Sequence, residues 1–217
     1  MFKSVVSIIA TLFMTTTLNT QAQTTIELPA PLTSGGMSLA EALSQRHSTR
    51  EFDPAKELTS RQISDLLWSA AGINRPESGM RTNPTALNTQ EIDLYLFDKD
   101  GVYLYDPKAN TLVRKAEGDH RALVAGTKAF SQDFVLDAPV SVVLIADLGR
   151  FERKGDFNAM MAAMDAGIVS ENICLYCSAA GLATVPRATM DKGGINKLLG
   201  LSDEHVPMLN NPVGYAK

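Results

Sequence analysis

Residues 157–180 read FNAMMAAMDAGIVSENICLYCSAA, a stretch whose side chains are apolar or small on nearly every side of a helix. A helix of this composition has almost no polar face. It is therefore expected to be buried, either at the centre of the molecule or in an interface between subunits. Gly181 follows directly and is a typical helix stop. The sequence thus predicts one long buried helix around which the remaining elements pack.

Strands are predicted on both sides of this helix. Residues 140–146 are a continuous apolar run rich in β-branched side chains, which is typical of a strand covered on both faces. Beyond the helix, residues 182–185 and 208–213 are expected to be closing strands, with a short helix near residues 194–199 between them.

Two helices are predicted near the start of the domain, each opened by a capping box. In Ser38–Glu41 and in Thr59–Gln62 a hydroxyl can cap the backbone while the fourth residue reaches back. The first helix is expected to end at residue 45 or 46 and the second at Gly72.

The middle of the chain mixes loop and strand signals. Residues 74–88 contain Pro and Gly and are predicted to be loop. Residues 91–97 alternate between apolar and polar side chains, which predicts a half-buried strand. Short strands are expected at 102–105 and 111–114, and a helix at 119–130.

This order of elements indicates an α+β fold, with helices flanking one sheet. The glycines form no G-x-G-x-x-G, and strands and helices do not alternate, so a Rossmann NAD domain is not expected. The 217 residues, 45% hydrophobic and 20% charged with a net charge of −4, are typical of one globular domain. Without a basic stripe, nucleic-acid binding is not expected.

The first residues are typical of a signal peptide. Lys3 gives a positive start, residues 5–14 are apolar, and Thr20-Gln21-Ala22 offers small residues for cleavage after about Ala22. The apolar run is shorter than the ~20 residues that span a bilayer, so no stable membrane span is expected. The prediction is an exported, periplasmic protein. Residues 23–37, rich in Pro and Gly, would be a mobile linker into a domain at 38–217.

The two cysteines, Cys174 and Cys177, lie three residues apart inside the predicted long helix. That spacing within a regular helix rarely reaches disulfide geometry, and a redox pair normally stands at a helix start. Buried core thiols are the preferred interpretation.

Residues 46–53, RHSTREFD, place two arginines and two hydroxyls within five residues. Guanidinium groups and hydroxyls of this kind can surround a phosphate, although a solvated basic turn would have the same composition. From these residues alone both interpretations stay open.

Four segments in order nevertheless resemble motifs of the nitroreductase family. They are RHSTREFD at 46–53, RTNPTALNTQ at 81–90, GLATVP at 181–186 and NPVGYAK at 211–217. The resemblance covers about residues 38–217, and the branch related to SagB-type dehydrogenases is the most similar. Two departures stand out, since Thr85 replaces the usual Ser and Arg187-Ala188 replaces a frequent Glu-Gly.

The resemblance implies a central, mostly antiparallel sheet flanked by helices, in a homodimer with FMN bound at its interface. It implies an FMN-dependent oxidoreductase with ping-pong hydride transfer through flavin N5, from NADH or NADPH to a small-molecule acceptor such as a nitroaromatic, quinone or flavin. Export makes a nicotinamide donor harder to supply. The alternatives are a SagB-like azoline dehydrogenase acting on modified peptides and a non-catalytic flavin-binding protein.

The resemblance also implies roles for individual residues. Arg46, Ser48 and Lys217 would bind the FMN phosphate, with the backbone of His47 beside them, and Arg50 would face the pyrimidine edge of the flavin. Backbone groups from Pro186 to Ala188 would approach flavin N5, while the Arg187 side chain would face solvent, an anionic substrate or a nicotinamide phosphate. The partner subunit would supply the segment Pro84, Thr85, Ala86, Leu87 and Asn88.

Overall fold

The computed structural model describes residues 24–217, so the predicted signal peptide lies outside the described part of the chain. These residues form an α+β fold around a seven-stranded sheet in the order β1-β6-β5-β4-β7-β9-β8, with all its strand pairings antiparallel. The strands are β1 (Thr25–Glu27), β4 (Ile92–Phe97), β5 (Gly101–Asp106), β6 (Thr111–Glu117), β7 (Val140–Asp147), β8 (Ala183–Thr184) and β9 (His205–Gly214).

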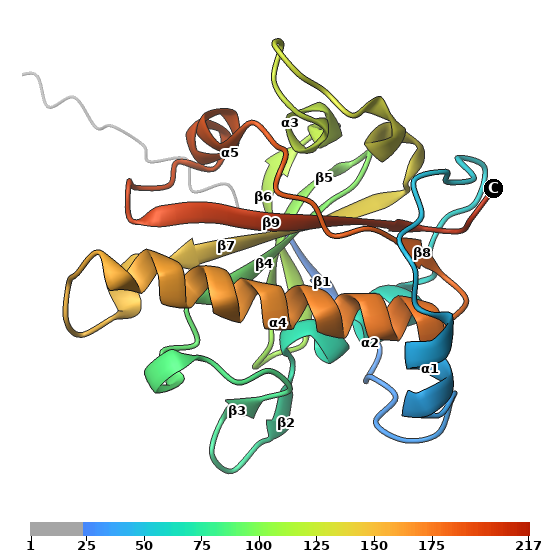
Figure 1. The fold of residues 1–217 in the computed structure, drawn as a ribbon, viewed down its shortest axis with the longest axis horizontal. Coiled ribbons are helices and arrows are strands. Elements are labelled where there is room, and N and C mark those ends of the chain that lie inside the picture. Colours follow the sequence, from blue (N-terminus) through green and yellow to red (C-terminus); the bar gives the residue numbers. More distant parts are fainter. Residues whose placement is uncertain (1–23) are drawn as a thin grey trace, which may run out of the picture.

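Helices cover both faces of this sheet. Figure 1 shows α1, α2 and α4 on one face, and α3 and α5 on the other. The helices are α1 (Leu39–Gln45), α2 (Ser60–Ala71), α3 (Arg121–Ala125), α4 (Phe157–Ala179) and α5 (Lys192–Leu199). Three single turns, η1 (Ala86–Asn88), η2 (Asp133–Asp137) and η3 (Leu148–Arg150), and a small hairpin, β2 (Ile73–Arg75) with β3 (Met80–Arg81), complete the described elements.

Strand β7 is covered on both faces, as its sequence predicts. Val142 and Leu144 pack into the core beneath α2 and α4, while Val143 and Ile145 pack into the second core beneath α3 and α5. Each fully buried side chain of this size contributes about 1.5–3 kcal/mol.

The prediction of a half-buried β4 is wrong. Its alternate residues Tyr95 and Phe97 are as buried as Leu94 and Leu96, because the second helical layer covers the face that was expected to meet water. The alternation of apolar and polar residues predicts one apolar strand face, but it does not show that aromatic side chains on the other face are also buried.

The two predicted capping boxes are present. Ser38 and Thr59 each accept a backbone hydrogen bond from the third residue of their helix, whose side chain returns to the cap. Helix α2 ends at Gly72, as predicted, and the N–H of Gly72 donates to the carbonyl of Trp68 at 2.8 Å. Local hydrogen bonding therefore sets both helix starts.

The segment expected to be a mobile linker belongs to the fold. Residues 25–27 form the edge strand β1 against β6, and the next residues cross α2. There the carbonyl of Pro29 accepts a bond from Ser64 Oγ at 2.6 Å, and Leu32 N–H donates to Asp65 at 2.8 Å. The Pro and Gly residues therefore give this segment an irregular backbone path, but the segment is packed against the domain.

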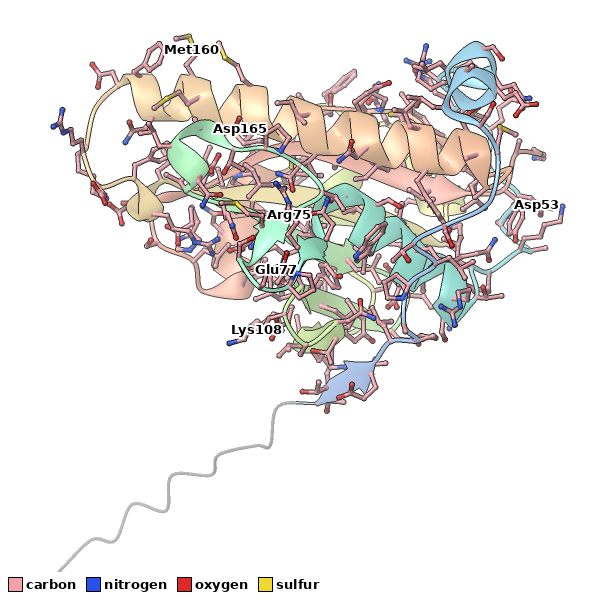
Figure 2. All side chains as sticks on the ribbon, turned by 90° about the horizontal axis from the view of Figure 1, so that it is seen from below. Asp53, Arg75, Glu77, Lys108, Met160 and Asp165 are labelled. Carbon is pink, nitrogen blue, oxygen red and sulfur yellow. The ribbon has the colours of Figure 1, made fainter. Side chains whose placement is uncertain are left out.

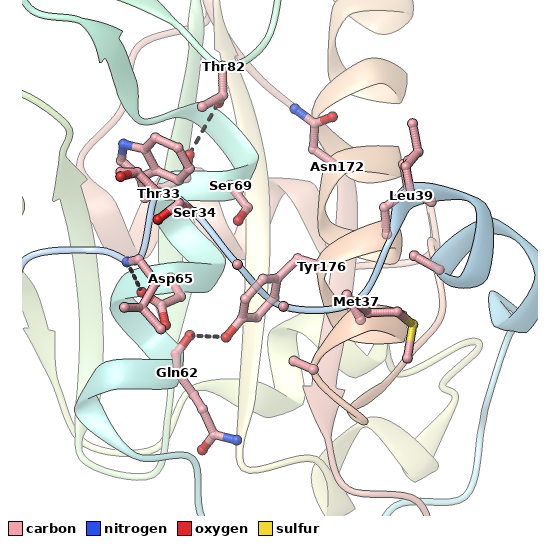
Figure 3. Close-up of a pocket in the computed structure, with 18 of the residues that line it drawn as sticks. Thr33, Ser34, Met37, Leu39, Gln62, Asp65, Ser69, Thr82, Asn172 and Tyr176 are labelled. Carbon is pink, nitrogen blue, oxygen red and sulfur yellow. Dashed lines mark hydrogen bonds between the residues drawn. The ribbon is translucent and has the colours of Figure 1, made fainter.

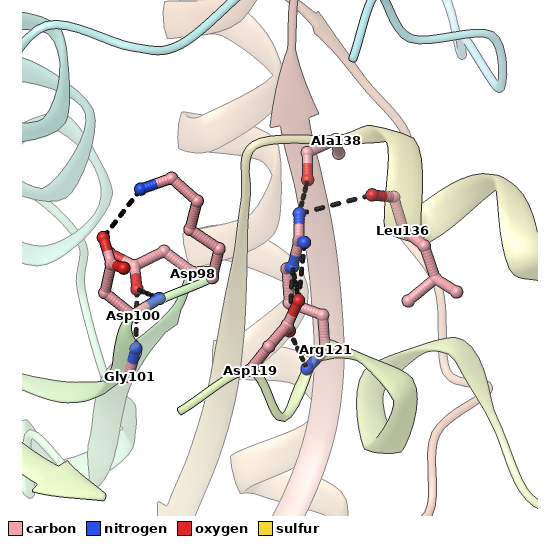
Figure 4. A network of polar contacts seen from close by, with 8 residues as sticks. Asp98, Asp100, Gly101, Asp119, Arg121, Leu136 and Ala138 are labelled. Carbon is pink, nitrogen blue, oxygen red and sulfur yellow. Dashed lines mark hydrogen bonds and ion pairs between the residues drawn. The ribbon is translucent and has the colours of Figure 1, made fainter. Parts of the chain in front are cut away.

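Helix α3 is shorter than the predicted helix at 119–130. It ends at Gly126, where φ is +155° and an added Cβ would lie 2.2 Å from the carbonyl oxygen of Phe130, so the chain turns back there. Arg121 ties the start of α3 to the end of η2, with bonds to Asp119 and to the carbonyls of Leu136 and Ala138 (Figure 4).

Among residues 24–217, no helix combines the length and the apolar composition that crossing a membrane requires.

Candidate functional site

Three of the sequence motifs meet at the C-terminal end of α4. The loop of residues 46–53 leaves α1, and the N–H of Thr49 donates to the carbonyl of Thr184 in β8 at 3.0 Å. Phe52 forms an antiparallel bridge with Ala216, and the N–H of Lys217 donates to the carbonyl of Glu51. The fold therefore brings residues 46–53, 181–186 and 215–217 together, although they are distant in sequence.

A cavity of about 210 Å³ opens between these segments. Arg46, His47 and the hydroxyl-bearing residues Thr49, Ser178 and Thr184 line it, and no carboxylate does. Helix α1 ends at Arg46, whose N–H bonds to the carbonyl of Ala42 and so sets the direction of the loop. The lining of this cavity is therefore basic and rich in hydroxyl groups.

The cations of this region form no ion pair within the described part of the chain, although Lys217 helps to lower the pKa of Asp53 after the larger effects of hydrogen bonds from Ala55 and Lys56. The side chains of Arg46, Arg50 and Lys217 make no ion pair or hydrogen bond within residues 24–217. Ser48 is exposed beside them. Three unpaired cations near a cavity without carboxylates fit an anionic group such as the phosphate of FMN.

Cys174 and Cys177 border the same cavity but are core residues, as predicted. Both are buried free thiols, and burial raises the pKa of Cys174 to about 11 and that of Cys177 well above its usual value. A protonated thiol is neither a nucleophile nor a metal ligand at neutral pH, so their contribution is packing.

The expectation that the Arg187 side chain faces solvent or an anionic substrate is wrong. Arg187 is buried, and its guanidinium donates to Gln132, Asn210 and backbone carbonyls. Its backbone N–H and carbonyl are both engaged with Asn210 of β9. The residues on either side, Pro186 and Ala188, are the exposed ones. An arginine is usually expected at the surface. Here neutral hydrogen-bond acceptors more than 20 residues away in the sequence hold the guanidinium in the interior.

A buried polar network that the sequence analysis missed supports the cavity. Ser170 Oγ donates to the side-chain oxygen of Asn211 at 2.8 Å, and the amide of Asn211 donates to Thr184 Oγ1 at 3.5 Å. Thr184 in turn holds Thr49. The network fixes α4, β9 and the loop of residues 46–53 relative to one another, since buried amides without partners are costly.

The segment Pro84–Asn88 lies elsewhere. It packs on the first half of α4, where the N–H of Ala86 donates to Asp165 at 2.7 Å. Figure 2 shows Asp165 and Asp53 toward opposite ends of the helix. At 1.5 Å per residue, Asp165 and Cys177 are about 18 Å apart along the axis. Within one protomer this segment is therefore separated from residues 46–50.

Leu87 is strained and exposed at once. Its φ is +56°, in the left-handed region that disfavours side chains, and 83% of its surface is accessible. Asn88 and Gln90 also have positive φ. A left-handed conformation costs about 1–2 kcal/mol at a residue that bears a side chain. Such strain in an exposed residue is typical of a functional loop.

Beneath this loop, two acidic residues are buried together, which sequence reasoning also missed. Glu91 is fully buried and accepts a bond from Thr89 Oγ1 at 2.5 Å, while Asp165 stands beside it. Burial, and then the proximity of Asp165, raises the pKa of Glu91. The signal in the sequence was Asp165 itself, an acidic residue in the apolar first half of helix α4.

Glu91→Gln is expected to change the pH dependence of stability. Because the folded pKa of Glu91 is raised, the folded protein binds more protons than the unfolded chain above about pH 4.3. Stability is therefore lost as pH rises through the raised pKa. The variant should not show this loss and should be more stable than wild type near neutral pH by about 1 kcal/mol. Urea denaturation between pH 4 and 8 measures it.

Glu77→Gln is the control, since Glu77 is exposed on the hairpin between β2 and β3 (Figure 2). Parallel stability profiles for wild type and Glu91→Gln would contradict a raised pKa of Glu91 in the folded protein.

A second cavity, about 760 Å³, lies between residues 32–39, α2 and the last turns of α4 (Figure 3). Its polar lining includes Gln62, Asp65 and Tyr176, and its apolar lining includes Leu39 and Leu175. None of the residues predicted to bind FMN lines it, so the larger cavity is not the predicted flavin site.

The chain is similar to known proteins of one family. The family model described as the nitroreductase family matches residues 43–215. A protein of Ralstonia eutropha JMP134 assigned as a nitroreductase is 36% identical, with a TM-score of 0.81 over 89% of this chain and 90% of the other. No curated protein matches the sequence significantly.

Two further structures share the fold at lower identity. A protein of Anabaena variabilis assigned as a nitroreductase is 20% identical, with a TM-score of 0.72 over 90% of this chain and 42% of the other. A chain of the Escherichia coli microcin synthetase complex is 17% identical, with a TM-score of 0.67 over 95% and 85%. The family match and the 36% identity establish that this chain belongs to the nitroreductase family, oxidoreductases that generally use FMN with NAD(P)H.

Proposed function

We propose that the protein is an FMN-dependent oxidoreductase that transfers hydride equivalents from NADH or NADPH to a small-molecule acceptor. The observation that supports it is the set of unpaired cations, Arg46, Arg50 and Lys217, around a cavity without carboxylates, at the positions of the family motifs. Family membership supplies the reaction class. The chemistry that FMN contributes when bound is acceptance of a hydride at N5 and its delivery to a second substrate.

The residues of this chain bind and orient the cofactor. Arg46, Ser48 and Lys217 offer charged and hydroxyl donors to the phosphate, which the cavity is large enough to hold. The flavin ring would lie beside this cavity, near Arg50 and the exposed Pro186, neither of which lines it. Arg50 stabilises negative charge at the pyrimidine edge. No side chain is needed as a dedicated acid or base.

We further propose that the working unit is a homodimer built on α4. Its outward face carries Phe157, Met160, Met164 and Ile168, all more than a third exposed, and Met160 points away from the protein in Figure 2. Leu39 and Leu43 of α1, which packs against α4, are exposed as well. Exposed apolar side chains that share one helix face are typical of an interface.

The same arrangement would complete the flavin site. If two copies of α4 pack antiparallel and cross near Ile168, the segment 84–88 of the partner lies beside residues 46–50 of this protomer. The segment 84–88 and residues 46–50, which are far apart within one protomer, would thus lie close together across the dimer interface. The exposed, strained Leu87 then has a ligand or a partner subunit to contact.

Leu87→Gly is expected to separate stability from function. Glycine adopts φ near +56° without strain, so the variant should stabilise the isolated protomer by about 1 kcal/mol. It should also weaken FMN binding, because a side chain that would cover the ring is lost. Urea denaturation in a monomeric background and FMN titration of the dimer measure the two effects. Tighter FMN binding by Leu87→Gly would count against this role.

The proposed reaction is tested by the visible spectrum of purified residues 23–217, before and after anaerobic addition of NADPH. A flavin spectrum that bleaches supports the cofactor and the hydride path together. A flavin spectrum that persists excludes NADPH as donor and favours the azoline-dehydrogenase or flavin-binding alternatives. A colourless protein that takes up no added FMN overturns the proposal.

The fold does not separate the azoline-dehydrogenase alternative from the preferred proposal. A chain of the microcin synthetase complex shares this fold over 95% of this protein, as the nitroreductase structures do. Export to the periplasm, with cleavage after about Ala22, is proposed from the N-terminal sequence, and mass spectrometry of the mature protein tests it. A periplasmic location would favour a donor other than free NADPH.

A further inference from the structure

Arg187 is a buried cation whose acceptors are all neutral. Its guanidinium donates to Gln132 Oε1 at 2.8 Å, to Asn210 Oδ1 at 2.7 Å, and to the carbonyls of Val124 and Ala125 at 3.2 and 3.1 Å. No carboxylate within residues 24–217 forms an ion pair with it. Burial lowers the pKa of Arg187 to about 10, so it stays protonated at neutral pH.

The charged group that next affects Arg187 is a second cation, Arg50, which lowers the same pKa further. A stack of side chains connects Arg187 to the loop that carries Arg50. The Arg187 guanidinium lies 5.4 Å from the centroid of the Phe134 ring, and Phe134 stacks on Phe52 with centroids 6.3 Å apart. Phe52 belongs to the loop that carries Arg50. Arg187 is therefore held behind the loop of residues 46–53.

An unpaired buried charge is costly, and its field is weakly screened because the surrounding medium is poorly polarisable. Here the field adds to that of Arg50, and no acidic side chain within the described residues pairs with either cation. Such an arrangement favours any negative charge that develops near Arg50.

We propose that Arg187 is a fixed positive charge that stabilises the reduced, anionic form of bound FMN and thereby raises the reduction potential of the cofactor. The inference rests on the proposed function, in which Arg50 faces the pyrimidine edge of the ring. Hydride transfer from a reduced nicotinamide delivers two electrons and one proton. The ring system gains one negative charge, and the donor leaves as oxidised nicotinamide. Arg187 thus favours the reduced form over the oxidised form, acting as a positioning and tuning residue.

Gln132 offers a test that leaves Arg187 in place. Gln132→Glu has nearly the same shape and puts a carboxylate where the amide oxygen lies, 2.8 Å from Arg187 Nε, which neutralises the buried charge. Gln132→Met is the matched control, because it removes the hydrogen bond and leaves the charge. The readouts are the dissociation constants of oxidised and reduced FMN and the midpoint potential, measured against an indicator dye.

In Gln132→Glu we expect the preference for reduced over oxidised FMN to fall about tenfold, equivalent to a potential about 30 mV lower. In Gln132→Met the preference should stay within about twofold of wild type. Arg187→Gln serves as a second variant, with the same expected shift in potential as Gln132→Glu. The melting temperature of Gln132→Glu should be no lower than that of wild type.

Two results would overturn the inference while the proposed function stands. One is FMN bound with equal potentials in wild type and Gln132→Glu. The other is a shift in Gln132→Met as large as in Gln132→Glu, which would make the role structural. A wild-type protein that binds no FMN would instead overturn both proposals.

Discussion

Ile168→Arg is expected to convert the protein into a monomer at micromolar concentration. Ile168 lies on the outward face of α4, 39% exposed in the isolated protomer, at the proposed crossing point of two antiparallel helices. A two-fold axis would place two unpaired guanidiniums in one apolar contact. An uncompensated buried charge costs about 3–5 kcal/mol, so the dimer dissociation constant should rise roughly a hundredfold to several thousandfold. Sedimentation equilibrium measures this change.

FMN binding should fall together with dimerisation, because the segment 84–88 of the partner would be missing from the site. Titration with FMN at protein concentrations above and below the dimer dissociation constant would show the coupling. The matched control is Ile26→Arg. Ile26 is also 39% exposed but lies on the edge strand β1, away from α4. A dimer that survives in Ile168→Arg, or FMN affinity that is independent of subunit concentration, would contradict the proposed interface.

The second large effect is expected from Arg46→Gln, which should weaken FMN binding about tenfold to a hundredfold. Arg46 lines the cavity proposed for the phosphate, and no described residue neutralises it. A hydrogen bond to a charged group contributes about 1.5–3 kcal/mol, which gives this range. Fluorescence quenching during titration measures the affinity.

Riboflavin makes this prediction specific, because it has the same ring but lacks the phosphate. Its affinity should change less than about twofold between wild type and Arg46→Gln. Lys108→Gln is the charge control, since Lys108 is exposed in the turn between β5 and β6, far from the cavity (Figure 2). An equal loss of affinity for riboflavin and FMN would show that Arg46 shapes the loop rather than binding the phosphate.

The candidate site could be predicted only in part. The cluster of residues 46–53, 181–186 and 215–217 follows from motif order, and the structure places these segments together. Gln132 could not be found this way. It joins the site only because the chain reverses at Gly126 and returns η2 to the neighbourhood of Arg187. Glu91 is a similar case, because the group that affects it, Asp165, belongs to a distant helix.

The sequence by itself determined the elements whose cause is local. Capping boxes set the starts of α1 and α2, a β-branched apolar run specified β7, and the apolar composition of residues 157–179 specified α4, because these signals act between neighbours on one element. Only the tertiary structure decided that residues 25–27 pair with β6, that β4 is covered on both faces, and that Arg187 lies inside. Each of these depends on partners far along the chain, whose approach is governed by the packing of whole layers.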